Sequence, residues 1–365
     1  MATMNDLVRF WARLAALTCG LMVAVATAQA GQSFGQWPTI DRADGLRSDN
    51  VSCMVCDSSG RFWIGTDSGL CSYQPREGRI RKGDSLTFYG DRENLASNIV
   101  QCLLLYDHDV LAIGTESGLS LGTHLGQEVP TFKFTFPGTE DLKNKSVQAL
   151  VRDTDGALWI GTNDGLYVLR NGKLTSQQFI ESARNVVTLN VLSIAVGQDV
   201  VWIGTYGHGL FKFSKTETDP VKRFTMIVRE SEGFFPSDDI RAVLLDSTGA
   251  LWVSEWGHGV IRYDIHGNST HYGHAQGFPG LAIQCLFIDS EQHLWMGTEG
   301  GVCRSEGSIE QLPLKFEFFT KNRDQIMGGA IRAIVEQKSD GHSTYWIGGS
   351  NGFCTFGGKL FTPPD

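Results

Sequence analysis

The chain has 365 residues and a formal net charge of −9, and charged side chains make up only 19% of it. Nucleic-acid-binding proteins present a basic face, so this acidic balance argues against a nucleic-acid partner. Glycine is abundant, with 43 residues, whereas proline occurs only 10 times. This composition is typical of a turn-rich all-β protein rather than of a disordered chain.

The first 30 residues have the order of a secretory signal peptide. Two arginines precede an apolar run over residues 14–27, and the small residues Ala28 and Ala30 follow it. The run is too short to span a bilayer comfortably, and no later segment is apolar enough to do so. We therefore expect residues 1–30 to be removed and residues 31–365 to be exported to the periplasm or secreted, without membrane insertion.

A phrase close to D-x-x-G-x-L-W-I-G-T-x-x-G-L recurs seven times in the rest of the chain, at spacings of 43 to 51 residues. This is the period of a propeller blade. The Asp can accept hydrogen bonds within its own turn, and the Gly supplies a positive φ. The sequence therefore predicts a seven-bladed β-propeller, all-β, with four antiparallel strands per blade. The copies begin at Asp57, Leu111, Asp153, Val201, Asp246, Asp289 and Tyr345.

One column of the repeat, in the expected innermost strand of each blade, holds only small residues. Strands converge near a propeller axis, so crowding there requires small side chains. The cysteines of this column are therefore assigned to packing rather than to redox or metal chemistry. The column holds Cys53, Cys102, Ala149, Ser193, Ala242, Cys285 and Ala333.

The two ends of the chain predict how the ring closes. The seventh copy of the phrase is followed by Pro363 and Pro364, which make a poor strand. Residues 34–40 belong to no blade of their own, so we expect them to supply the missing outer strand of blade seven. The outer strands expected for blades one to six are residues 86–89, 132–136, 177–180, 224–228, 270–272 and 316–319.

The repeated phrase, preceded in several blades by segments such as D-G-L-R-S-D-N-V at residues 44–51, resembles the two-component-regulator propeller repeat. That family builds the periplasmic sensor of many bacterial hybrid histidine kinases, often as two seven-bladed propellers followed by a small β-domain, a membrane helix and the kinase. The resemblance covers essentially all of residues 31–365 and implies a sensor-like propeller. A free-standing binding protein and a fragment of a longer gene are both compatible with it.

A ligand site is expected on the face that carries the turns after W-I-G-T, which we call the upper face. In blades four and five these turns are longer and contain an aromatic residue and a histidine, and Glu255 replaces the usual Thr. Aromatic rings stack on sugars, whereas amides and guanidinium groups recognise hydroxyls and carboxylates. We therefore expect a small-molecule ligand, most simply an oligosaccharide, or a periplasmic protein partner, with no cofactor or metal. The expected ligand-binding residues are Tyr206, His208, Arg241, Glu255, Trp256, His258, Arg332, Gln101 and Gln284, with Gln148 in the same column as the last two.

Two alternatives remain open at this stage. The segment L-W-V-S-E at residues 251–255 is similar to the W-F-T-E phrase of streptogramin lyase propellers, in which a glutamate and histidines near a Mg²⁺ ion carry out an elimination. That resemblance implies Glu255 as the glutamate, His258 or His208 as general base, and Mg²⁺ as cofactor. The second alternative is a purely structural scaffold, because turns of this kind also cap sheet edges. A non-enzymatic binding protein is the preferred interpretation.

Overall fold

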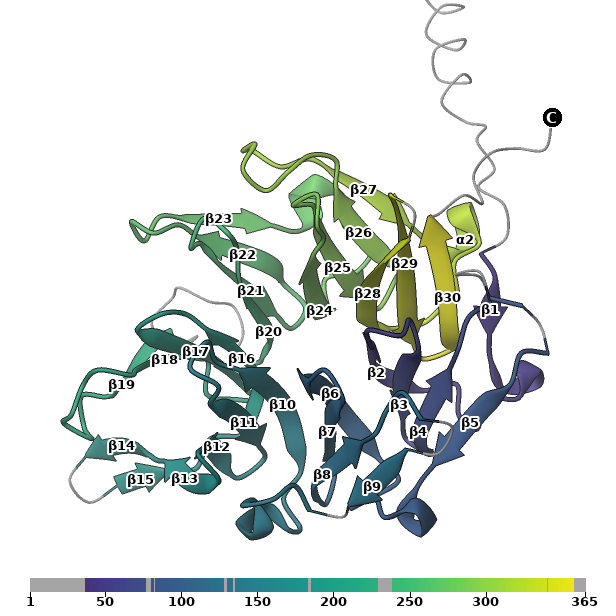
Figure 1. Ribbon diagram of the computed structural model, residues 1–365. Helices are drawn as coiled ribbons and strands as arrows, with labels where there is room; N and C mark the ends of the chain where they lie inside the picture. Colours follow the sequence, from purple (N-terminus) through teal and green to yellow (C-terminus); the bar gives the residue numbers. More distant parts are fainter. Residues whose placement is uncertain are drawn as a thin grey trace, which may run out of the picture. The chain divides into compact units, whose positions relative to one another are not determined.

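The computed structural model describes residues 37–357, except 77–79, 82, 128–129, 134, 183–184, 229–237 and 340. The expected signal peptide and the proline-containing C-terminus lie outside the described residues. Within the described part, seven four-stranded antiparallel sheets follow one another along the chain, each with its strands paired in a meander. These sheets are the blades of a β-propeller (Figure 1), so the predicted fold is confirmed.

Each blade of the first half begins with its innermost strand. Blade one comprises β2 (Val51–Cys56), β3 (Phe62–Thr66), β4 (Gly69–Tyr73) and β5 (Leu86–Tyr89). Blade two comprises β6 (Val100–Asp107), β7 (Val110–Thr115), β8 (Gly118–Thr123) and β9 (Thr131–Lys133). Blade three comprises β10 (Val147–Arg152), β11 (Leu158–Thr162), β12 (Gly165–Arg170) and β13 (Lys173–Gln177).

The second half of the ring repeats this order. Blade four comprises β16 (Val191–Val196), β17 (Val200–Thr205), β18 (Leu210–Ser214) and β19 (Phe224–Val228). Blade five comprises β20 (Ile240–Leu245), β21 (Leu251–Glu255), β22 (Gly259–Tyr263) and β23 (Ser269–Tyr272). Blade six comprises β24 (Ile283–Ile288), β25 (Leu294–Thr298), β26 (Val302–Ser305) and β27 (Phe316–Phe319). Blade seven comprises β28 (Ile331–Ser339), β29 (His342–Gly349), β30 (Gly352–Gly357) and β1 (Thr39–Ile40).

Short helical turns lie mostly in the segments that lead into the innermost strands. Adjacent innermost strands contact one another around the whole ring, including β28 against β2, which closes it. The helical turns are η1 (Arg42–Asp44), η2 (Asp91–Glu93), η3 (Glu140–Leu142), η5 (His274–Gln276) and α2 (Lys321–Asp324).

Ring closure by the N-terminal segment is confirmed. Strand β1 pairs antiparallel with β30, with Thr39 opposite Cys354 and Ile40 opposite Phe353. The Ile40 side chain is only 2% exposed in the core between blades seven and one. Trp37 stacks on Phe356 of β30, with ring centroids 4.5 Å apart. The segment therefore contributes both a strand and two core side chains to blade seven.

The outer strand expected for blade three was wrong. Residues 171–172 form a tight Asn-Gly turn in which both residues have positive φ, 52° and 74°. Such a turn returns the chain at once as a hairpin strand, so β13 already ends at Gln177. The following residues instead form a separate two-stranded sheet of β14 (Phe179–Ser182) and β15 (Asn185–Val187), which lies at the periphery in Figure 1.

The residues of the small column lie opposite the second strand of the same blade, at positions where there is little space for a side chain. Each of its residues pairs with a Gly of the second strand, except Ala242, which pairs with Ser254. A Cβ placed on Gly65 would lie 2.4 Å from the Cys53 Sγ atom. Burial raises the pKa of the Cys53 and Cys285 thiols to about 12, which disfavours the reactive thiolate. The structure thus supports the packing role of these cysteines.

The Asp of the D-x-x-G turn also binds the repeat tryptophan, a contact that the sequence analysis did not predict. In blades one, three, five and six the Trp Nε1–H donates to that carboxylate over 2.8–3.0 Å. The two residues are always six positions apart, which puts the Trp on the strand that leaves the turn. In blade six Asp289 also accepts a hydrogen bond of 2.8 Å from the Tyr345 hydroxyl of blade seven.

Replacing Asp289 by Ala is expected to destabilise the propeller by about 2–3 kcal/mol, because two buried aromatic donors lose their acceptor. Asp57 is a matched control, since its carboxylate accepts from one aromatic donor, Trp63. We expect Asp57→Ala to cost about 1 kcal/mol less. Urea denaturation of both variants measures the difference, and equal losses would show that neither the Tyr345 hydroxyl nor His293 Nδ1, which lies 3.3 Å from the Asp289 carboxylate, adds stability.

Candidate functional site

Hydrogen bonds define the upper face. The Trp256 N–H donates to the Asp239 carbonyl in the segment that leads into its own blade, over 3.1 Å. The Gly259 N–H donates to the Leu281 carbonyl in the segment that leads into the next blade, also over 3.1 Å. Each turn after W-I-G-T therefore lies against two lead-in segments, as expected.

A β-bulge occurs at the start of every innermost strand and frees one residue per blade from the ladder. In blade five, for example, the register shifts between Ile240 and Ala242, so Arg241 is the bulged residue. The column predicted from sequence is therefore this ring of bulges, which also includes two residues that were not singled out, Ser52 and Leu192. In order around the ring the bulged residues are Ser52, Gln101, Gln148, Leu192, Arg241, Gln284 and Arg332.

Arg241 is brought together with the aromatic residues of two adjacent turns. Its guanidinium carbon lies 4.5 Å from the centre of the Trp256 ring and 5.8 Å from that of Tyr206. Both rings are unusually open for large aromatic residues, with exposed fractions of 38% and 51%. Blades four and five thus present two aromatic faces with one positive charge between them on the upper face.

Several buried polar atoms near this end of blades three to five have no hydrogen-bond partner among the described residues. They come from the bulges, from the segment that leads into blade four and from the end of β21. Buried polar atoms are normally paired, so these atoms can form hydrogen bonds to ordered water or to a further molecule. The atoms are Gln148 Oε1, Asn190 Oδ1, Ser193 Oγ, Arg241 Nε and both carboxylate oxygens of Glu255.

Glu255 occupies a position that holds Thr in five blades, where the Thr hydroxyl donates to the carbonyl of the turn glycine, as Thr205 does to Gly209 over 2.7 Å. The Glu255 side chain is fully buried. Burial without a partner raises the pKa of its carboxyl to about 8. Burial, and after it the charge of Glu255, raises the pKa of Tyr263.

The two histidines of the predicted site do not pair with Glu255. The His208 Nδ1 atom lies 3.2 Å from the Tyr206 carbonyl of its own turn. His258 uses its backbone, since its carbonyl accepts a hydrogen bond of 2.6 Å from His271 Nε2. A glutamate–histidine pair for proton transfer is therefore not assembled among the described residues, and these residues contain no group of three or more candidate metal ligands.

The remaining predicted site residues lie elsewhere on the ring. Arg332 of blade seven hydrogen-bonds to Asn50 in the segment that leads into blade one, and Asn50 in turn donates to Asp67 over 3.1 Å. It is therefore held in a contact between blades. Gln101 and Gln284 occupy the bulges of blades two and six, so Gln284 is adjacent to Arg241 in the ring whereas Gln101 is not.

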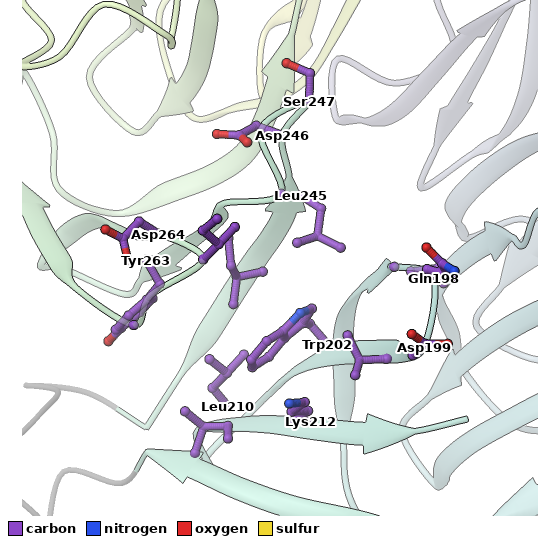
Figure 2. A pocket seen from close by; sticks show the side chains of 18 residues that line it. Gln198, Asp199, Trp202, Leu210, Lys212, Leu245, Asp246, Ser247, Tyr263 and Asp264 are labelled. Atoms are coloured by element: carbon purple, nitrogen blue, oxygen red, sulfur yellow. The ribbon is translucent and has the colours of Figure 1, made fainter. Parts of the chain in front are cut away.

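The structure also contains a cavity that the sequence analysis missed. It lies between blades four and five, has a volume of about 1020 Å³ and is open at the lower face, where the turns at residues 197–199, 246–249 and 264–267 line it. Figure 2 shows the Trp202 ring in the middle of this cavity, with Asp199 on one side and Tyr263 on the other. Its signal in the sequence is the shortened turn V-G-Q-D-V at residues 196–200, where blade four lacks the D-x-x-G motif.

Comparisons with known proteins agree with the repeat. The family profile of the two component regulator propeller matches residues 45–68, 141–164 and 277–300. The chain is 24% identical over 201 residues to histidine kinase P4 of Formosa agariphila, a match that covers 52% of this chain and 14% of the kinase. No helix among the described residues is long and apolar enough to cross a membrane.

Solved structures share the fold at low sequence identity. The extracellular domain of a hybrid two component system of B. thetaiotaomicron is 22% identical, with a TM-score of 0.69, over 90% of this chain and 41% of that one. Virginiamycin B lyase from Staphylococcus aureus is 13% identical, with a TM-score of 0.61, over 88% of this chain and 97% of the lyase. At these identities the similarity establishes the propeller architecture and no more, and the chain spans less than half of the extracellular domain.

Proposed function

We propose that the chain, a seven-bladed propeller in which three segments match the two component regulator propeller profile, is an exported sensor propeller that binds a carbohydrate on the upper face of blades four and five. The periplasm or the cell exterior is the compartment that the N-terminal sequence favours. The extracellular domain of similar fold agrees with this placement.

The stacked group of Tyr206, Arg241 and Trp256 is the observation that carries the proposal. Exposed aromatic faces on adjacent turns can stack on the apolar faces of sugar rings. The guanidinium between them provides donors for a carboxylate, and its Nε–H has no partner among the described residues. A glycan that contains a uronic acid is therefore the expected ligand class. His208, His258 and Gln284 are proposed to surround it, whereas Glu255 is fully buried.

Replacing Trp256 by Ala is expected to weaken glycan binding at least about tenfold, which corresponds to ~1.4 kcal/mol. Arg241→Ala should weaken binding of uronate-containing oligosaccharides more than that of neutral ones. Ile265→Ala is the control, because Ile265 is 70% exposed on a turn of the lower face. Thermal shift and isothermal titration calorimetry measure both effects. Unchanged affinities in Trp256→Ala would contradict the site, and a periplasmic protein partner would then remain for this surface.

A lyase of the streptogramin type is the second candidate, and only the shared architecture favours it. It requires a Mg²⁺ ion near Glu255 and a histidine that acts as general base. Glu255 is buried without a partner, and neither His208 nor His258 contacts it. The binding protein is therefore the better-supported function. Mg²⁺-dependent turnover that is lost in Glu255→Gln would reverse this order.

A further inference from the structure

We propose that the cavity between blades four and five is a second binding site, for a hydroxylated aromatic compound. Its volume of about 1020 Å³ is at the upper end of the range of small-molecule pockets. It opens at the lower face, so it is distinct from the upper-face site. Most of its walls are apolar, and they are formed by Val196, Leu210, Ile227, Leu245, Leu251 and the ring of Trp202.

Trp202 lacks, among the described residues, the indole hydrogen bond that the other repeat tryptophans make, and its ring is less buried. Among the described residues, the indole N–H groups of Trp63, Trp159, Trp252, Trp295 and Trp346 all donate to an Asp or Gln side chain. Within the described part of the chain the Trp202 N–H has no such acceptor, because the shortened turn of blade four provides no Asp at that place. Its ring is also partly exposed, whereas the five others are at most 2% exposed. An aromatic face and an unpaired donor are therefore available in the cavity.

Most polar side chains of the cavity belong to the lower-face turns of both blades and lie on different sides of the Trp202 ring in Figure 2, with Gln198 and Asp199 from blade four and Asp246, Ser247 and Asp264 from blade five. The carboxylate of Asp199 makes no hydrogen bond or ion pair within the described part of the chain, and Lys212 places its Nζ atom 5.7 Å from the centre of the Trp202 ring. A hydroxyl group of a ligand can accept from the indole N–H and donate to the Asp199 carboxylate. A ligand therefore needs polar substituents at the edge that faces the turns and an apolar body against the strands.

This distribution favours an aromatic ligand over a sugar. A sugar ring carries hydroxyls around its whole edge, and each hydroxyl placed against Leu210, Leu245 or Leu251 would lose its hydrogen bonds to water without replacement. The cost is about 1–3 kcal/mol per group. A phenol or catechol instead presents an apolar ring to these walls and to Trp202, and its hydroxyls can point towards Asp199.

Calorimetry and ligand-observed NMR on the full chain, with catechol and 4-hydroxybenzoate as probes and glucose as the comparison, test the proposal. We expect binding of the aromatic probes only. Trp202→Phe removes the donor and should weaken binding about three- to tenfold. Leu245→Trp places a large side chain in the cavity and should weaken binding, while the melting temperature is kept or raised. Trp256→Ala should bind the aromatic probes as the wild type does, which separates this site from the upper-face site.

Three outcomes would overturn the proposal. Binding of glucose that is weakened by Trp202→Phe would make the site a sugar site. Aromatic binding that is unchanged in both Trp202→Phe and Leu245→Trp would place the probes elsewhere on the protein. Absence of probe binding to the wild type would show that the cavity does not take aromatic ligands.

Discussion

Removal of residues 37–41 is expected to abolish the cooperative unfolding of the propeller. These residues carry β1, which pairs with β30, and they place Trp37 and Ile40 in the cores on either side of blade seven. Without them β30 becomes an exposed sheet edge, and blade seven keeps three strands. Burial of the Trp37 and Ile40 side chains contributes about 2–5 kcal/mol each to the free energy of unfolding.

A substitution at Gly352 tests the same ring closure without removing a strand. Gly352 has a φ of +92°, and a Cβ at this position would lie 2.1 Å from the Ile40 carbonyl oxygen of β1. Gly165 occupies the same place in the repeat of blade three, with a φ of +115° and no atom within 4 Å of its Cβ position. Both Ala variants carry the backbone strain, so the difference between their urea midpoints measures the closure. Equal midpoints, or a truncated protein that melts cooperatively, would contradict closure by β1.

Glu255→Gln is expected to stabilise the protein at pH 8 and to remove a pH dependence of its stability. The pKa of the buried carboxyl is about 8 in the folded protein, against an ordinary value of 4.5. Between these two values the unfolded chain releases a proton that the folded chain retains, so the stability of the wild type falls as the pH rises from about 4.5 to 8. Well above pH 8 the loss is complete and amounts to ~5 kcal/mol.

The measurement is the free energy of unfolding at pH 5 and at pH 8, for the wild type and the variant. Glu299→Gln is the matched control, because Glu299 lies exposed on the equivalent turn of blade six. Glu255→Thr, which restores the residue found in five other blades, should stabilise at pH 8 in the same way. A wild type and a Glu255→Gln variant with parallel pH profiles would show that the carboxyl ionises normally in the folded protein.

The repeat made most of the fold predictable, because each copy carries its own turn signals and the period of a blade. Ring closure also followed from the sequence, since the proline-containing C-terminus could not supply a strand. The outer strand of blade three failed for a local reason. The Asn171-Gly172 turn starts a strand immediately, whereas the other blades have longer connections there, and the average spacing of the repeat concealed this difference.

The candidate site was only partly predictable. Tyr206 and Trp256 stand out because they break a repeated turn, and the column register placed Arg241 near them. The same register could not show that Arg332 is bound by Asn50, because that contact joins residues far apart in the chain. The cavity was not predicted, because blade four lacks the Asp of the D-x-x-G turn. The repeat pattern draws attention to unusual residues that are present and not to a residue that is missing.

The seven bulges have a consequence for how such a protein can change. Each bulge frees one side chain from strand pairing, so substitution at Gln101 or Leu192 leaves the ladder bonds and the small column beside it intact. Ligand specificity can therefore change by substitutions in one blade at a time, because the residues that determine the fold belong to the repeated phrase. A library restricted to these seven positions is the most economical way to redirect the upper face towards a new ligand.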